Sequence, residues 1–228
     1  MKISILFLSL FACITAAFAS SNSEFLVEGE QAFYDNDVPR LSALLDQASE
    51  QDQFVMRYRL AAMYMSAQDM VSAKSKVSSL ISDLEAHVKS EPSDAEAWAI
   101  LSSVYGMMAG LDPSKMITYG TKSGMAEGTA EQSDKNNSAV LLLIGINKVY
   151  TPEQYGGGHK NALRYLDSAV ISYMADEDVR SWGFVDALVW RAKVNATLGN
   201  SEQAQKDIEA AIKLQPTFGF AISTLAEL

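Results

Sequence analysis

The segment Thr151–Lys160, TPEQYGGGHK, contains the residue types of a phosphate-binding loop. Three consecutive glycines precede a His and a Lys, so backbone amides and an ammonium group would be available to an anion. The spacing differs from G-x4-G-K-[ST], no strand pattern precedes it, and Asn161 stands where a metal-binding hydroxyl is needed. We interpret the segment as a lengthened turn between two helices, which presents Tyr155 and His159 as contact residues for a partner.

No other group of residues has the spacing of a catalytic or metal site. The two histidines, His87 and His159, lie far apart, and neither has a companion three or four residues away that makes a metal-binding pair. The motifs of serine hydrolases, zinc proteases and EF-hands do not occur. We interpret the acidic stretch ADEDVR, residues 175–180, as a polar loop. The sequence predicts neither an enzyme nor a bound metal or cofactor.

Charge and cysteine content exclude further classes of function. The formal net charge is −10, which repels DNA and RNA and argues against a nucleic-acid partner. The single cysteine, Cys13, lies in the N-terminal apolar segment, so the rest of the chain has no disulfide or thiol nucleophile. The longest later apolar run, residues 139–146, is too short for a transmembrane helix and fits a buried helix or strand.

The N-terminus has the features of a secretory signal peptide. One lysine is followed by apolar and small residues from Ile3 to Phe18, and the segment ends in the small-x-small pattern of Ala17–Ala19. A membrane anchor is the alternative, but a spanning helix needs about 20 apolar residues. Lipoprotein processing at Cys13 is a second alternative, disfavoured by the bulky Phe11 and the short apolar run. We expect export to the periplasm, with secretion or a lipid anchor as less favoured outcomes.

The chain after residue 19 has few strand signals and many good helix formers. Its five prolines all fall between segments of apolar periodicity, where proline begins a helix without breaking one. The sequence therefore predicts an all-α fold. The expected helices are 24–36, 38–50, 53–67, 69–90, 93–110, 113–128, 134–150, 159–174, 180–198, 201–214 and 217–227.

Two distant segments repeat the same pattern. Ala61 and Ala73 are twelve residues apart, and so are Ala192 and Ala204. In both cases the second alanine is followed by a large apolar residue at plus four and an apolar or small residue at plus seven. A third segment, DAEAWAILSSVYG, matches W-x2-L-G-x2-Y with Ser102 in place of glycine. Two antiparallel helices approach closely only where small side chains meet, so each pattern predicts one helix pair.

This pattern is similar to the tetratricopeptide repeat (TPR), a helix-turn-helix unit of about 34 residues. The resemblance implies a right-handed superhelical solenoid of antiparallel helix pairs, with about four to five units and a C-terminal capping helix. It divides residues 20–228, which follow the signal peptide of residues 1–19, into a degenerate or capping pair, four repeats and a capping helix: 24–50, 53–90, 93–128, 134–174, 180–215 and 217–227.

The resemblance also implies a binding surface. In the TPR family, peptides lie in the concave groove formed by the first helix of each pair. Transferred to this sequence, the groove residues are Val55, Tyr58, Ala62, Met65, Glu96, Ala99, Ser103, Asp186, Val189 and Lys193. The early groove is apolar and aromatic and the late groove carries both charges, which would suit a partner segment with an apolar stretch and a basic residue. We expect Tyr58 to face outward and to be dispensable for stability.

Taken together, these patterns predict an exported scaffold or adaptor that binds a protein or peptide through the groove or through the loop at 151–160. The alternative is a ligand-binding accessory protein of an envelope transport system. We expect no nucleic-acid partner and no integral membrane segment in the mature chain, and a homo-oligomer remains an open alternative.

The signal-peptide interpretation has a direct test. We expect the exported protein to begin at Ser20, because Ala17 and Ala19 form the pattern that signal peptidase reads. N-terminal sequencing of the purified protein checks this, and an acylated Cys13 or an intact Met1 would contradict it.

Overall fold

The computed structural model describes residues 25–175 and 182–228. The signal segment, its cleavage after Ala19, the alternative at Cys13 and residues 176–180 of the acidic stretch lie outside this part. The described residues form helices and no β-strand. None of these helices is both long and apolar enough to cross a membrane.

The described part begins with a helical segment at 25–34 and continues with α-helices and two short turns of 3₁₀ helix. In chain order, the elements are α2 (Val38–Leu45), α3 (Glu50–Ser66), α4 (Met70–Ser90), α5 (Ala95–Leu111), η1 (Pro113–Lys115), α6 (Met116–Ser133), α7 (Ser138–Tyr150), η2 (Glu153–Tyr155), α8 (His159–Ala175), α9 (Phe184–Thr197), α10 (Ser201–Leu214) and α11 (Gly219–Glu227).

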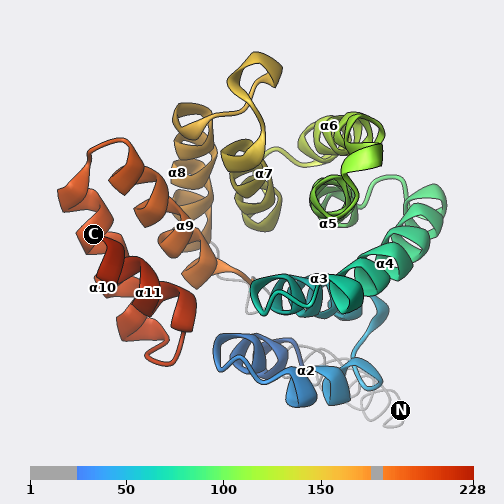
Figure 1. Ribbon diagram of the computed structural model, residues 1–228, viewed down its shortest axis with the longest axis horizontal. Coiled ribbons are helices and arrows are strands. Elements are labelled where there is room, and N and C mark those ends of the chain that lie inside the picture. The colour runs from blue at the N-terminus through green and yellow to red at the C-terminus, as the bar shows by residue number, and fades with distance from the viewer. Residues whose placement is uncertain (1–24, 176–181) are drawn as a thin grey trace, which may run out of the picture.

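Consecutive helices pack as pairs, α3 with α4, α5 with α6, α7 with α8, and α9 with α10. Figure 1 shows the pairs arranged around a ring, with α3, α5, α7 and α9 on the inside and α4, α6, α8 and α10 on the outside. The terminal helix α11 packs against α9 and α10. The expected all-α helical solenoid is therefore confirmed.

The helices begin where the sequence supplies a capping side chain. A side-chain oxygen accepts a hydrogen bond from a backbone amide of the first turn in five helices, α2, α3, α4, α5 and α7; the caps are Asp37, Ser49, Asp69, Asp94 and Asn137. Such a cap satisfies one of the amides that have no partner within the helix. Several helix ends differ from expectation by three to five residues; α3 begins at Glu50 instead of 53 and α7 at Ser138 instead of 134, and the two largest differences are at C-terminal ends. Helix α2 ends at Leu45 instead of 50, and α6 continues to Ser133 because Ala126 and Ala130 are buried.

Small residues lie at the helix crossings, as the repeat pattern requires. Ala61 and Ala73 in the first pair and Ala192 and Ala204 in the last are fully buried. At the α7–α8 crossing a Cβ atom on Gly145 would lie 2.8 Å from the Leu166 side chain, so a larger residue does not fit without movement.

The second pair uses hydrogen bonds at the same position. Ser102 of α5 donates to the backbone oxygen of Ser123 in α6, and Ser123 donates to the backbone oxygen of Ser102, both at 2.9 Å. These two hydrogen bonds hold α6 against α5. The other outer helices α4 and α10 instead bury apolar side chains at helical spacing.

The alanine crossing of the last pair can be tested by overpacking. We expect Ala204→Leu to lower the free energy of unfolding by about 1–3 kcal/mol, because the fully buried site has no room for the added methylene groups. Urea unfolding followed by circular dichroism measures the change. The control is Gln205→Leu one position further, at an exposed site, which should change stability by about 0.5 kcal/mol or less. Equal effects of the two changes would contradict the crossing.

Candidate functional site

The residues expected to line an open groove face the inside of the ring, but most are buried. The expectation that Tyr58 faces solvent is wrong, since only 9% of it is exposed. The same correction applies to the other buried members of the predicted set, Val55, Ala99, Ser103, Asp186 and Val189. Half-buried members are Ala62, Met65, Glu96 and Lys193. The physical reason is that the inner helices pack against one another and against a tryptophan whose position among them was not predicted from the sequence.

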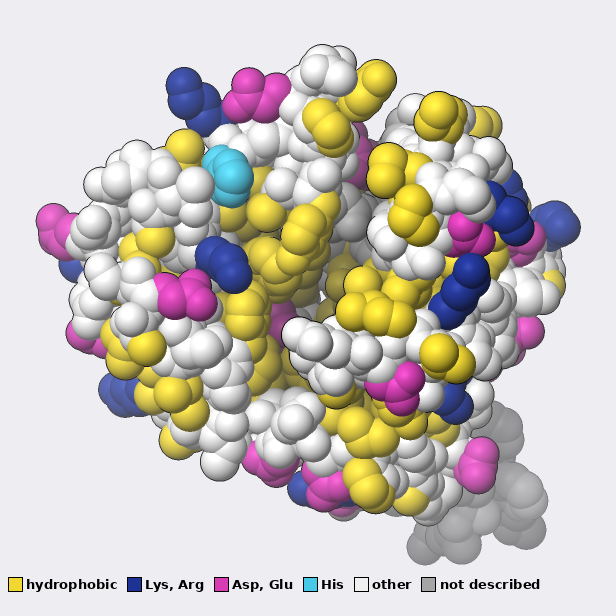
Figure 2. All heavy atoms as spheres, in the orientation of Figure 1, with side chains coloured by type: hydrophobic (Ala, Val, Ile, Leu, Met, Phe, Trp, Pro, Cys, Tyr) yellow, Lys and Arg dark blue, Asp and Glu magenta, His cyan; other side chains and the backbone are white. Residues whose placement is uncertain are grey.

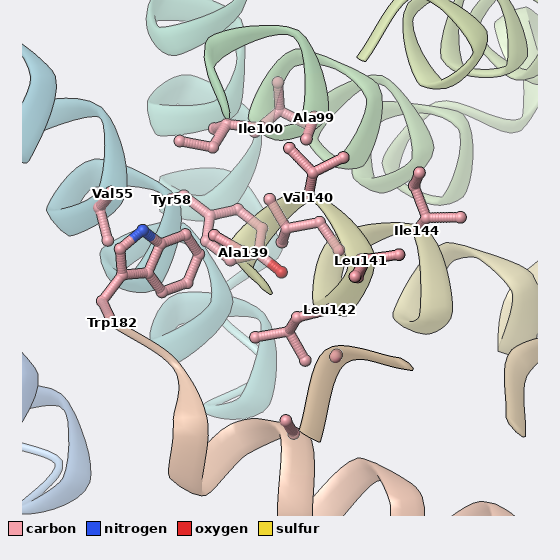
Figure 3. Close-up of a cluster of buried hydrophobic side chains, with 14 of the residues drawn as sticks. Val55, Tyr58, Ala99, Ile100, Ala139, Val140, Leu141, Leu142, Ile144 and Trp182 are labelled. Atoms are coloured by element: carbon pink, nitrogen blue, oxygen red, sulfur yellow. The ribbon is translucent and has the colours of Figure 1, made fainter. Parts of the chain in front are cut away.

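That tryptophan is Trp182, which precedes α9 and lies between the inner helices. Figure 3 shows its indole ring beside Val55 and Tyr58 of α3, and its ring centroid is 6.4 Å from that of Tyr58. Its Nε1 donates a 2.7 Å hydrogen bond to Oε1 of Glu96 in α5, and its backbone oxygen accepts one from Tyr173 of α8. One residue thus contacts α3, α5 and α8, and the predicted groove residue Glu96 is engaged within the chain.

A buried charge cluster lies next to Trp182. Arg59 of α3 is 2% exposed, and its Nη2 donates to Oε1 of Glu30 at 2.9 Å and to Oδ2 of Asp186 at 3.0 Å. The Tyr34 hydroxyl, with one proton to donate, lies within hydrogen-bond distance of both carboxylates, 2.9 Å from Glu30 and 3.0 Å from Asp186. The rings of Phe33, Tyr34 and Trp182 lie 4.4–5.3 Å from the guanidinium carbon, which adds cation–π attraction.

The remaining guanidinium nitrogens of Arg59, Nε and Nη1, have no hydrogen-bond partner among the described residues and are shielded from solvent. Burial raises the pKa of the Asp186 carboxyl above its usual range; Arg59 opposes the rise and Glu30 adds to it. The cluster is therefore held by mutual pairing, and the charge of Asp186 depends on the arginine beside it.

This cluster joins the two ends of the described chain. Glu30 also accepts a 2.8 Å hydrogen bond from the Gly183 amide, just before α9. The Thr217 hydroxyl, just before α11, donates to Asp35 at 2.6 Å, and the rings of Tyr34 and Phe218 are 4.6 Å apart. The helical segment 25–34 thereby packs against the last helices and closes the ring.

A more accessible surface begins one helical turn beyond the charge cluster. Asp186, Trp190 and Lys193 share one face of α9, since they are four and three residues apart. The Trp190 ring centroid lies 5.9 Å from Tyr150 at the end of α7 and 5.3 Å from Phe220 of α11. We call these three rings, Tyr150, Trp190 and Phe220, the aromatic row.

The aromatic row is partly open to solvent. Tyr150 is 72% exposed, and Trp190 and Phe220 are half-buried. The Lys193 ammonium lies 5.2 Å from the centroid of the Phe220 ring, and within the described part of the chain it makes no ion pair. The face of the molecule drawn in Figure 2 is hollowed near its centre, with hydrophobic side chains in the walls of the hollow. This arrangement offers flat apolar surfaces and one cation to a bound molecule.

Among solved structures, the chain is similar to TTC0263, a thermophilic TPR protein in Thermus thermophilus. The TM-score is 0.52 at 15% sequence identity, and the match covers 90% of this chain and 99% of that chain. The chain has a TPR-like fold. No protein-family model and no curated protein matches it. At this identity the likeness supports the TPR-like fold alone, and the chemistry of the site must be argued from its own residues.

The glycine loop of this TPR-like chain uses its backbone amides internally. The amide of Gly156 donates to Glu153, that of Gly157 to Pro152, and that of Gly158 to Lys148 and Thr151. Gly156 and Gly158 have φ of 80° and 90°, and a Cβ on Gly157 would collide with the Thr151 carbonyl. The loop is therefore a lengthened turn, as predicted. Tyr155 is exposed and His159 half-buried, and their role as partner contacts remains a prediction.

His87 has a structural environment. Its Nε2 lies 2.8 Å from Oδ2 of Asp94, the residue that caps α5, and its ring packs edge-on against Phe54 at 5.0 Å. No group of three or more candidate metal-ligating side chains occurs in the described ranges.

Sequence reasoning missed the side chains that matter most here. In RYRLAAMYM, Arg59 is followed only by apolar and aromatic residues, and Arg57 lies two positions earlier on a different side of a helix. This is a usable signal for a buried pair, because a charge on an inward face needs a partner. The aromatic row had no such signal, since Tyr150, Trp190 and Phe220 belong to three different helices and meet only in the folded chain.

The charge cluster predicts that removing Arg59 makes the free energy of unfolding depend on pH. We expect Arg59→Met to lower the free energy of unfolding by about 3–5 kcal/mol near neutral pH, because it leaves the buried Asp186 and Glu30 uncompensated. The pKa of Asp186 is already raised in the folded chain, and without Arg59 it rises further. The folded variant then holds a proton that the unfolded chain releases, so stability is lost as the pH rises through the folded pKa and is partly regained at acid pH.

Denaturant unfolding at pH 5 and pH 8 measures this difference. Arg57→Met is the matched control, since Arg57 pairs with Asp83 at a partly exposed site and should contribute about 1 kcal/mol or less. A loss in Arg59→Met that does not shrink at acid pH would contradict the assignment.

Proposed function

We propose that this TPR-like chain is a non-enzymatic scaffold that binds a protein partner on the inner side of its ring, through the aromatic row and Lys193. The observation that carries the proposal is the partly exposed aromatic row. Its central ring, Trp190, lies one helical turn after the buried Asp186 on the same face of α9. Aromatic rings supply a large part of the binding energy at protein interfaces, and accessible ones in a hollow are therefore candidates for contact.

The deeper residues of the predicted groove do not serve this role as well. Val55, Tyr58 and Val189 are buried in the core, and Glu96 and Asp186 already hold Trp182 and Arg59. A partner would need to displace these contacts to reach them. The aromatic row needs no such displacement, because Tyr150 in particular is largely exposed.

The residues at the row indicate the chemistry of a suitable partner segment. The three rings favour aliphatic or aromatic side chains, and the ammonium of Lys193 favours an acidic group or a backbone carbonyl beside them. This differs from the basic residue expected from sequence, since the acidic side chains of the groove are engaged within the chain. Capture of a small ligand gains no specific support, because the inward residues Val55, Tyr58 and Val189 are packed into the hydrophobic core.

Export is part of the proposal and rests on the N-terminal sequence alone. The apolar segment and Ala17–Ala19 pattern support a protein that works in the periplasm. The partner should then be sought among envelope proteins.

The row is tested by comparing variants as bait in envelope extracts, with quantitative mass spectrometry of the bound proteins. We expect Trp190→Ala to lose a partner that the unchanged chain retains, and to weaken the affinity for that purified partner at least about tenfold, since such anchors contribute about 2 kcal/mol or more. Lys193→Glu should also weaken binding, and it alters no buried core residue.

Tyr155→Ala is the matched control, because Tyr155 is as exposed as Tyr150 but lies in the loop. Circular dichroism and melting temperature show whether each variant is folded. Loss of binding in Tyr155→Ala with full binding in folded Trp190→Ala and Lys193→Glu would move the contact to the loop and contradict the proposal.

A further inference from the structure

The outer helix α6 exposes large apolar side chains to solvent. Ile117 is 86% exposed and Met125 is 71% exposed. They lie on the side of the helix opposite the buried Ala126 and Ala130, together with Gly120, Thr121, Gly124 and Gly128. We call these six residues, Ile117, Gly120, Thr121, Gly124, Met125 and Gly128, the outward face of α6. None of them carries a charge.

This face has no partner within the described chain. Helix α6 packs closely on α5 and has only sparse contact with α7. Gly120, Gly124 and Gly128 are one turn apart, and a Cβ atom on any of them would meet nothing within 4 Å. Glycine weakens an exposed helix relative to alanine, so three of them without an internal contact are unfavourable for the isolated chain. By contrast, the solvent-facing positions of α10 are charged or polar, as in Glu202, Gln205 and Lys206.

Larger side chains and glycines alternate along the outward face of α6, so two copies of this face can fit together with each larger side chain against a glycine. We propose that it binds α6 of a second copy of this chain, antiparallel, about a two-fold axis between Lys122 and Ser123. That axis places Ile117 opposite Gly128 of the second copy, Thr121 opposite Gly124, and Met125 opposite Gly120. Each larger side chain therefore meets a glycine, and each contact occurs twice, as an isologous interface requires. The glycines let the two helices approach closely.

The charges at the ends of the face fit the same arrangement. Lys115, just before α6, makes no ion pair within the described part of the chain. Glu131 near the other end of α6 is exposed and accepts a hydrogen bond from the Tyr165 hydroxyl at 2.8 Å. An antiparallel pair about this axis brings Lys115 of each copy close to Glu131 of the other, which is one residue beyond the directly opposed position, and it also sets the two helix dipoles antiparallel. A parallel pair would place like charges together, so the charge pattern selects the antiparallel one.

A single helix contributes a small interface, so we expect a reversible dimer that forms with increasing concentration. Because α6 lies on the outside of the ring, the aromatic row stays accessible in both copies. Dimerisation would make the scaffold bivalent and would raise its avidity for a partner that offers two binding segments.

Sedimentation velocity over a concentration series of the purified chain tests the proposal. We expect a monomer–dimer equilibrium that Ile117→Glu abolishes, because the variant places a carboxylate against Gly128 of the second copy. Val71→Glu is the matched control: Val71 is 84% exposed on α4 and lies outside the face, so this variant should dimerise as the unchanged chain does.

Four further variants separate dimerisation from stability and from binding of other partners. Gly124→Ala should raise the melting temperature, since alanine favours the helix, yet weaken the dimer, since the Cβ separates the two helices. Lys115→Glu and Glu131→Lys should each weaken the dimer several-fold, and the double variant should restore it, which only self-association predicts.

A chain that is monomeric throughout the series overturns the proposal, and the face would then belong to a different protein. Dimers that persist in Ile117→Glu, or that Gly124→Ala leaves unchanged, overturn it equally. The variants leave the aromatic row intact, so failure here is distinguishable from failure of the proposed partner binding.

Discussion

The buried guanidinium of Arg59 sets the constraint on which the ring depends. A cation that is shielded from water requires carboxylates at hydrogen-bond distance, and Arg59 finds them on two elements from opposite ends of the chain, the helical segment 25–34 and α9. Tyr34 and Gly183 complete the same pairing. A helical solenoid would otherwise be open at both ends. Here the ends are joined through α3, and separating them would leave charges buried without partners.

Closure explains why the inner side is largely core. Once the terminal helices meet, Trp182 lies among α3, α5 and α8 and covers residues that would line a groove in an open solenoid. Partner binding, as we propose it, then shifts to Tyr150, Trp190 and Phe220, where the inward face of α9 emerges from the core. The same closure engages Glu96 and Asp186, which leaves Lys193 as the charge that a partner would meet at the row.

The outer layer shows a different use of the same helix pairs. Reciprocal serine hydrogen bonds join α6 to α5, and α6 has only sparse contact with α7. Its opposite side therefore needs no packing within the chain, and apolar side chains and glycines alternate on it. Inner and outer surfaces are thus separate, which allows a scaffold to hold a partner on one side and, as we infer, a second copy on the other.

Local patterns in the sequence determined the helices, their capping residues and the small residues at the crossings, because each depends on neighbours within one helix pair. They also determined that the glycine loop is a turn, since its amides bond to carbonyls at most ten residues away. Only the tertiary structure decided which inward residues are accessible. Arg59 and Asp186 are 127 positions apart, and their meeting depends on the rotation from each helix pair to the next, which accumulates around the ring. That accumulated curvature buried Tyr58, brought Trp182 into the centre, and left Trp190 at the edge of the core.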